Sequence, residues 1–270
     1  MTLAILTYES GPANYITRHL LQRFPGQIRG MLRSRAIIRG KGALASCWYI
    51  VRRGGFSFVA HKGAEVLLGG LAAAAIGTTG RMPPVPSLRQ LGTAYRVPLI
   101  ESRDVNTPGT LAALREWRPD LLLSVHFNQR LGTEVLALPP QGALNVHGAL
   151  LPRNRGLFPH FWVLANGDGE TGVTVHWMDA GIDTGDILLQ ERIAITPEST
   201  AASLGWDAAR VGAPLLVKAV ELVEQGAAPR IPQLGGGTYL SWPRAADMRR
   251  LRERGRRYGL VPELWKALSF

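Results

Sequence analysis

The sequence is nearly free of cysteine, since Cys47 is the only one among 270 residues. A single cysteine excludes an intramolecular disulfide framework and any zinc site built from several thiolates. The patterns G-x-G-x-x-G and G-x-x-x-x-G-K-[ST] are also absent, which removes the main support for a dinucleotide site or a P-loop. The shortage of cysteine fits a reducing, cytoplasmic setting, which we expect for this chain.

Signals for secretion and for membrane spanning are also missing. The first ten residues, MTLAILTYES, lack the charged segment and long apolar core of a secretory signal and predict a buried strand instead. The longest uncharged apolar run, Val66 to Ile76, is shorter than the roughly 20 residues that cross a bilayer.

That apolar run belongs to a hydrophobic and basic region around residues 40–82, which we interpret as an insert. We expect it to form one or two buried helices. A membrane-surface helix, an oligomer contact or a lid over the substrate are the alternatives. His61 has no ligand-like neighbour there and is expected at the surface or at a helix end.

Acidic residues are in short supply: 31 Lys and Arg stand against 20 Asp and Glu, for a net charge of +11. An anionic small molecule, RNA or a membrane surface are partners that suit such a charge. The alternative is a set of solvated helix faces in an arginine-rich protein. The charge is concentrated in residues 1–63 and in seven arginines near the end: Arg244, Arg249, Arg250, Arg252, Arg254, Arg256 and Arg257.

The chain contains enough apolar residues, 46%, to bury a normal core. Strand-like and helix-like segments alternate along it: strands at 3–6, 28–31, 98–101, 119–127 and 172–177, with helices at 15–24, 107–117 and 159–166. Such alternation predicts an α/β fold with a mostly parallel central sheet and helices on both faces. The run at 119–127 predicts a strand that is buried on both faces.

The chemistry is concentrated between Leu144 and Asp186. Asn145 and His147 are two residues apart on a predicted strand at 142–146 and its end, so their side chains project from the same face. The carboxyl ends of strands are where open α/β sheets place active sites. Asp183 lies between Gly181 and Gly185, on a turn flexible enough to bring a carboxylate back toward the strand.

This stretch resembles the signature of the folate-dependent formyltransferases. The blocks N-x-H-G-x-L-L-P-x-x-R-G, T-G-V-T-x-H-x-M and G-x-D-T-G-D follow one another in the order found in that family's catalytic domain. The resemblance covers about residues 95–225. It implies a Rossmann-like formyltransferase fold and transfer of the formyl group of 10-formyltetrahydrofolate to a primary amine.

The resemblance also implies roles for three residues. Asn145 and His147 would stabilise negative charge on the formyl oxygen, and Asp183 would orient His147 and accept the amine's proton, through water or directly. This sequence has Ala149 where the family usually has serine, a change that touches none of the three positions.

The resemblance further implies the residues that hold the folate and the amine. The backbone after the strand at 119–127 would bind the pterin, a leucine-rich loop would close over it, and the turn before Asp183 would flank it. These residues are Asn128, Gln129, Arg130, Leu131, Leu150, Leu151, Pro152, Asp179, Ala180, Gly181 and Ile182. The amine would lie near the first strand-to-helix turn and a tight turn at 155–156, where Arg155 contacts an anion or forms a salt bridge. The candidates are Ser10, Gly11, Pro12, Asn14 and Arg155.

A carboxylate metal site is a further interpretation of this region. Asp179, Asp183 and Asp186, with His176, have ligand-type side chains. We prefer a turn shaped by Asp179 and Asp186 and expect no metal. His126 and Trp162 are expected in the core.

The predicted organisation is a catalytic domain over residues 1–230 and an arginine-rich C-terminal extension over 231–270, in which Thr238 and Tyr239 resemble the element that closes the family's catalytic domain. Methionyl-tRNA formyltransferases usually carry a tRNA-binding barrel domain at this point, and the sequence given shows none. The preferred acceptor is therefore a small, anionic amine such as an amino sugar, a nucleotide-linked sugar or an amine of specialised metabolism. The alternatives are a formyltetrahydrofolate hydrolase, an acyltransferase with another donor, and a non-catalytic relative that binds RNA or membranes.

Overall fold

The computed structural model describes residues 1–35, 42, 45–46, 48–54 and 85–259. Most of the predicted insert at 40–82, including Val66 to Ile76 and His61, lies outside these residues. The described part of it is helical at 45–46 and 48–54.

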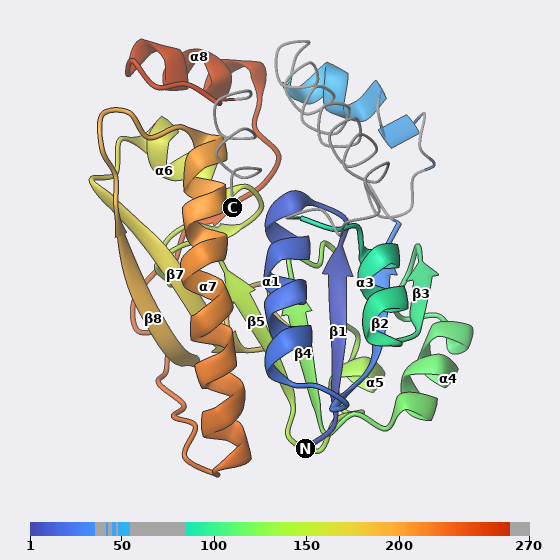
Figure 1. The fold of residues 1–270 in the computed structure, drawn as a ribbon. Coiled ribbons are helices and arrows are strands. Elements are labelled where there is room, and N and C mark those ends of the chain that lie inside the picture. Colours follow the sequence, from blue (N-terminus) through green and yellow to red (C-terminus); the bar gives the residue numbers. More distant parts are fainter. Residues whose placement is uncertain (36–41, 43–44, 47, 55–84, 260–270) are drawn as a thin grey trace.

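A central sheet organises the described part of the chain. Seven strands form it in the order β3-β2-β1-β4-β5-β7-β8 (Figure 1). The five strands from β3 to β5 run parallel, and β7 and β8 are antiparallel. The mostly parallel α/β sheet is therefore confirmed. The strands are β1 (Leu3–Tyr8), β2 (Ile28–Ser34), β3 (Leu99–Ser102), β4 (Leu121–Val125), β5 (Ala143–His147), β7 (Glu170–Trp177) and β8 (Ile187–Ala194).

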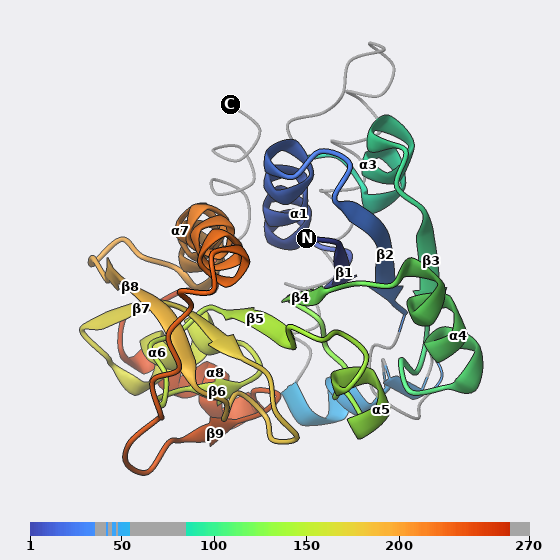
Figure 2. The ribbon, with the colours of Figure 1, turned by 90° about the horizontal axis from the view of Figure 1, so that it is seen from below.

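Helices cover both faces of this sheet, as predicted (Figure 2). On one face, α1 (Gly11–Arg23), α3 (Leu88–Tyr95) and α7 (Ala201–Glu224) bury apolar side chains against the sheet. On the other, α4 (Pro108–Trp117) and the short α5 (Thr133–Leu136) pack on a second cluster. All five residues of β4 are buried, which confirms a strand covered on both sides.

The C-terminal part packs against the end of the sheet. Helix α6 (Pro159–Asn166) and helix α8 (Ala245–Glu253) share an apolar cluster that includes the buried ring of Trp162, a predicted core residue. The indole N–H of Trp162 donates to the Ser241 carbonyl at 3.0 Å. Met248 and Leu251 anchor α8, whose arginines face solvent.

The predicted tight turn at residues 155–156 is instead a two-residue strand. β6 (Arg155–Gly156) pairs with β9 (Tyr239–Leu240) in a small parallel sheet. The Arg155 N–H donates to the Thr238 carbonyl at 2.9 Å, and the Leu157 N–H donates to the Leu240 carbonyl at 2.9 Å. The turn prediction was wrong because a partner strand more than eighty residues away extends this segment.

The order of the strands reverses at one point of the sheet. The chain adds strands in one direction from β1 to β3 and in the other from β4 to β5, so the order reverses between β1 and β4. Open parallel sheets bind ligands at the carboxyl ends of the strands at such a reversal. Within the described residues, no helix is both long and apolar enough to cross a membrane.

Candidate active site

A row of polar side chains crosses three neighbouring strands beside this reversal. Ser124 on β4, Asn145 on β5 and His176 on β7 are register partners. The Ser124 hydroxyl donates to Asn145 Oδ1 at 2.8 Å, and Asn145 Nδ2 donates to His176 Nε2 at 3.1 Å. These contacts fix the orientation of the Asn145 amide, with Oδ1 toward Ser124 and Nδ2 toward His176.

The contacts of His176 define the tautomer of its neutral ring. Its Nδ1 donates to the Trp177 carbonyl at 2.7 Å, so the neutral ring leaves Nε2 as the acceptor for Asn145. His176 Nε2 also lies 3.5 Å from Asp183 Oδ1 and can donate to that oxygen only when the ring is doubly protonated.

His147 lies on the same face of β5, as the spacing of two predicted. Its Nε2 donates to the Asn154 carbonyl at 2.9 Å, and its Nδ1 lies 3.6 Å from Asp183 Oδ2. Asn145 Nδ2 donates to the other carboxylate oxygen, Oδ1, at 3.4 Å. The structure thus brings Asn145, His147 and Asp183 together, with the carboxylate between two strand side chains.

The Asp183 carboxylate is buried, with only 13% of its side chain exposed. Burial raises the pKa of Asp183, but the positive charge of His147, the contact with His176 and the Gly156 N–H outweigh it and hold the pKa well below its usual value. The Gly156 N–H donates to Asp183 Oδ2 at 2.7 Å. Asp183 is consequently ionised at neutral pH.

The two segments predicted to hold the folate lie side by side. The Arg130 guanidinium donates to the Ala180 carbonyl and so ties residues 128–131 to the turn at 179–182. The Asp179 carboxylate accepts from the Gly181 N–H at 2.9 Å and from the Thr184 hydroxyl at 2.7 Å, so Asp179 shapes its turn. The side chain of Ile182 is 42% exposed beside Asp183.

Three side chains of the first segment have structural partners. Gln129 is buried, accepts from the Val105 N–H at 2.7 Å and donates to the Ser34 hydroxyl at 2.7 Å. Asn128 Oδ1 accepts from the same Ser34 hydroxyl at 2.5 Å, and Leu131 is buried in the core. This segment therefore offers a ligand its backbone more than these side chains.

The leucine-rich loop is anchored to the antiparallel strands. The Thr174 hydroxyl donates to the Ala149 carbonyl at 2.6 Å and accepts from the Leu151 N–H at 3.1 Å. Leu151 is 4% exposed and belongs to the interior, whereas Leu150 and Pro152 are half-buried. Leu150 and Pro152 therefore leave part of their side chains accessible to a ligand, whereas Leu151 does not.

The predicted amine-binding turn after β1 is largely occupied by its own contacts. Ser10 caps helix α1 by accepting from the Ala13 N–H at 3.4 Å, and Pro12 stands in the first turn. A side chain at Gly11 would lie 2.7 Å from the Trp206 ring. Asn14 is buried, and its Nδ2 donates to Glu9 at 2.7 Å and to the Pro86 carbonyl at 3.0 Å.

Two further predictions need correction. Among the described residues no carboxylate pairs with Arg155, so its salt-bridge alternative was wrong: its Nη2 donates to Gln233 Oε1 at 2.6 Å, and the anion contact stays a prediction. His126 is half-buried at the end of β4, with φ at 53°, and is not a core residue, because the chain leaves the sheet there. Within the part of the chain that the structure describes, no three His, Cys, Asp or Glu side chains gather as a metal site.

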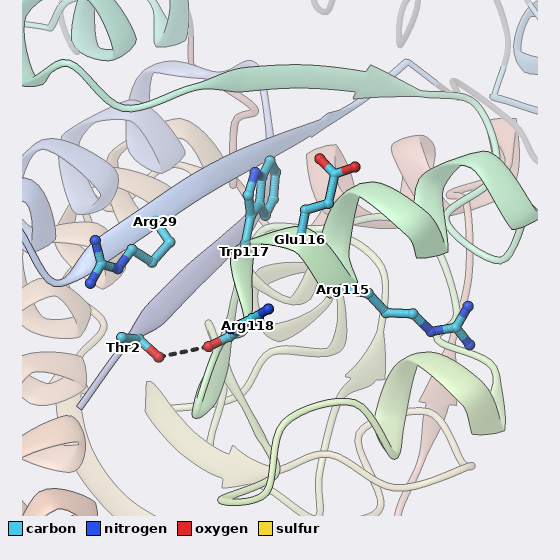
Figure 3. A pocket seen from close by; sticks show the side chains of 6 residues that line it. All are labelled: Thr2, Arg29, Arg115, Glu116, Trp117 and Arg118. Atoms are coloured by element: carbon cyan, nitrogen blue, oxygen red, sulfur yellow. Dashed lines mark hydrogen bonds between the residues drawn. The ribbon is translucent and has the colours of Figure 1, made fainter.

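A hollow of about 700 Å³ lies elsewhere, at the amino ends of β1 and β2 and the end of α4 (Figure 3). Its lining residues are Thr2, Arg29, Arg115, Glu116, Trp117 and Arg118. The side chains of Arg29 and Arg115 point away from one another (Figure 3). The hollow therefore lacks the convergent groups that Asn145, His147 and Asp183 provide at the other end of the sheet.

Sequence reasoning missed four residues that hold this site: Ser124, Asn154, Thr174 and Gln233. Thr174 and His176 alternate on β7, and a period of two places both on the face of Asn145 and His147. Ser124 interrupts an otherwise apolar strand, so both signals were available. Asn154 and Gln233 act through loops that show no periodic pattern.

Fold and site together define an α/β domain with an Asn–His–Asp cluster beside the strand-order reversal. A model of the family described as "Formyl transferase" matches residues 79–220, and the chain belongs to this family. The match covers the predicted 95–225 almost entirely and begins earlier.

Curated relatives and solved structures extend this finding. Methionyl-tRNA formyltransferases of Pelotomaculum thermopropionicum and Symbiobacterium thermophilum are 39% and 42% identical over 160 and 172 residues, which is 59% and 63% of this chain. The aligned part is 51% and 52% of those proteins, so the chain spans about half the length of the curated relatives it matches.

Two solved structures share the fold. The N-formyltransferase of Helicobacter canadensis, in complex with folinic acid and dTDP-3-aminofucose, matches with a TM-score of 0.58 and 17% identity, covering 89% of this chain and 71% of that one. The phosphoribosylglycinamide formyltransferase of Streptococcus pneumoniae gives 0.54 and 16%, covering 83% and 99%.

Proposed function

We propose that this protein transfers the formyl group of 10-formyltetrahydrofolate to a primary amine. The observation that carries the proposal is the convergence of Asn145 and His147 on the Asp183 carboxylate, at 3.4 and 3.6 Å, in a member of the formyl transferase family. The site also lies beside the strand-order reversal, where a parallel sheet binds its ligand.

The reaction requires groups that this site supplies. The amine nitrogen forms a bond to the formyl carbon, the bond from that carbon to N10 of the folate breaks, and the amine's proton ends on N10. Negative charge develops meanwhile on the formyl oxygen. One N–H of Asn145 Nδ2 is held by His176, and the other, which makes the longer contact of 3.4 Å with Asp183, is the donor that the residue offers to this oxygen at any pH.

Asp183 has a more specific role in this scheme than the sequence predicted. A carboxyl whose pKa is well below its usual value is ionised at neutral pH but is a weak base. We therefore assign it to holding the charge and orientation of His147, and we route the amine's proton through water. A protonated His147 presents Nδ1–H next to Asp183 Oδ2 and adds positive charge at the reacting centre.

The segments 128–131 and 179–182 are the proposed folate-binding walls. Arg130 joins them, the exposed Ile182 provides apolar surface, and the half-buried Leu150 provides more. Backbone N–H and C=O groups of these loops suit the hydrogen-bonding edge of a pterin. The folate supplies the formyl group and leaves as its N10 amine.

For the acceptor, we propose a small amine on an anionic carrier, such as a nucleotide-linked amino sugar. The net charge of +11 supports a negatively charged substrate. The second candidate is the methionyl-tRNA used by relatives that are 39% and 42% identical. Both acceptors present a primary amine on a phosphate-bearing molecule.

The test begins with calorimetric titration of the protein with a stable analogue of 10-formyltetrahydrofolate. Purified protein is then incubated with the donor and either nucleotide-linked amino sugars or methionyl-tRNA, and products are examined by mass spectrometry for an added formyl group. Formate release without any acceptor indicates a hydrolase instead. Folded protein that fails to bind the analogue at millimolar concentration would contradict the proposal.

A further inference from the structure

Asp183 has an unusual backbone for a residue with a side chain. Its φ is 54°, in the left-handed region that favours glycine. The loop also approaches β7 closely, since a side chain at Gly185 would lie 1.9 Å from the Trp177 carbonyl. Contacts from outside the loop also bear on this conformation.

Gln233 makes the contacts that hold it. Its Nε2 donates to the Asp183 carbonyl at 2.9 Å and to the Gly185 carbonyl at 2.7 Å, so one amide grips the loop on both sides of the turn. Its Oε1 accepts from Arg155 Nη2 at 2.6 Å and from Arg155 Nε at 3.2 Å. Every polar atom of the Gln233 side chain is thus engaged.

These contacts close a ring around the carboxylate. Arg155 is followed by Gly156, whose N–H donates to Asp183 Oδ2 at 2.7 Å. From the Asp183 carbonyl the ring passes through Gln233 and Arg155 to Gly156 and back to the Asp183 side chain. Backbone and carboxylate of one residue are therefore fixed by the same set of contacts.

Residues near Gln233 in the sequence also contact the segment that holds His147. Thr238 accepts the Asn154 N–H through its hydroxyl at 2.9 Å and the Arg155 N–H through its carbonyl at 2.9 Å. The Asn154 carbonyl is the acceptor for His147 Nε2. A side chain at Gly237 would lie 2.6 Å from the Arg155 guanidinium carbon. The segment 233–240 is therefore packed directly against Asn154, which holds His147, and against Arg155, which precedes Gly156.

We infer that Gln233, which lies fifty residues beyond Asp183 and outside the span matched by the family model, is a positioning residue for the Asp183 carboxylate. It touches no reacting atom. It acts by fixing the height and direction of the carboxylate relative to His147 and Asn145. This inference rests on the proposed function only for its kinetic consequence, and its geometric consequence stands without it.

The kinetic arm compares Gln233→Ala and Gln233→Glu with the wild type, and Gln225→Ala serves as the matched control at an exposed helix end. Displacing a group by about 1 Å costs on the order of 10²-fold in rate, so we expect kcat to fall by roughly 10- to 100-fold. The KM for the folate should stay within about 3-fold, because the folate walls do not depend on Gln233.

A double-mutant cycle separates positioning from general damage. In an Asp183→Asn background, Gln233→Ala should cost less than about 3-fold more, since the group that it positions is already gone. An additional loss equal to that in the wild type, or unchanged kcat in folded Gln233→Ala and Gln233→Glu, overturns the inference. Thermal unfolding identifies any variant that does not fold, and Gln233→Glu then replaces Gln233→Ala because it keeps the shape and the Arg155 contact.

A spectroscopic arm does not depend on activity. The Gly156 amide proton, hydrogen-bonded to the charged Asp183 carboxylate, should shift in the NMR spectrum of Gln233→Ala and stay in place in Gln225→Ala. A fixed Gly156 resonance in Gln233→Ala overturns the inference even if no acceptor is found. Absence of wild-type formyl transfer with a shifted Gly156 resonance counts against the proposed function alone.

Discussion

The two candidate halves of the site differ in what their polar side chains do. On β5, Asn145 and His147 point toward a shared carboxylate, that of Asp183, which follows β7. After β1, Ser10 caps its helix and Asn14 is buried against Glu9 and Pro86. The polar side chains of the first half converge on one point, while those of the second half satisfy hydrogen bonds of their own turn and helix.

The difference follows from how each half is built. Asn145, His147 and His176 stand on neighbouring strands, whose register aligns their side chains along one face without local competition. The turn after β1 begins a helix, and the first N–H groups of a helix need partners that short polar side chains supply best. A polar residue in such a turn is therefore a weaker sign of function than one on a strand row.

The largest effect is expected from Asp183→Asn, which keeps the shape and removes the charge between the two strand side chains. We expect kcat for formyl transfer to fall by roughly 10²- to 10³-fold, the scale found when one electrostatic contact to a transition state is removed. Steady-state kinetics with the identified acceptor measures it, with Asp207→Asn as a surface control. A loss below about threefold would mean that Asp183 matters no more for the reaction than the polar residues after β1.

A smaller effect, on stability, is expected from Gly156→Ala, which tests the pairing of β6 with β9 beside Asp183. Gly156 has φ at 100°, and a side chain there would lie 2.1 Å from the Leu240 carbonyl. Separation of β6 from β9 should reduce the free energy of unfolding by about 2 to 3 kcal/mol, the upper range for a single substitution. Urea unfolding measures it, with Gly109→Ala, where the added carbon meets open space, as the control. Equal stability of the two variants would contradict the close approach.

The same carboxylate should make stability depend on acid. Because the pKa of Asp183 is lowered on folding, its contribution is present above the unfolded pKa near ~3.9 and is lost as pH falls through the folded value. The difference in free energy of unfolding between wild type and Asp183→Asn should therefore shrink below about pH 4. Chemical unfolding at a series of pH values checks this. A difference that grows toward acid pH would mean that the charged form is not favoured by folding.

The sequence predicted which residues gather in the proposed catalytic half better than it predicted the residues that support them, for a physical reason. Strand periodicity fixed the common face of Asn145 and His147, and motif spacing supplied Asp183. Gln233 and Asn154 escaped prediction because they act through backbone carbonyls, which any residue possesses and no pattern marks. Arg155 was singled out, yet its partner is an uncharged glutamine 78 residues away. The parallel sheet was also predictable from a regular pattern, because strands and helices alternate along the chain.

The smallest effect is expected in the half after β1, where Ser10→Ala removes a helix cap. Loss of such a cap costs about 1 kcal/mol, and if Ser10 serves only α1, kcat and the KM for the amine should change by less than about twofold. Thermal unfolding and steady-state kinetics on the same preparation measure both. Ser10→Asp, which keeps a capping oxygen, should restore stability. A tenfold rise in the KM for the amine in Ser10→Ala, with stability intact, would give this turn a part in holding the acceptor and remove the contrast between the two halves.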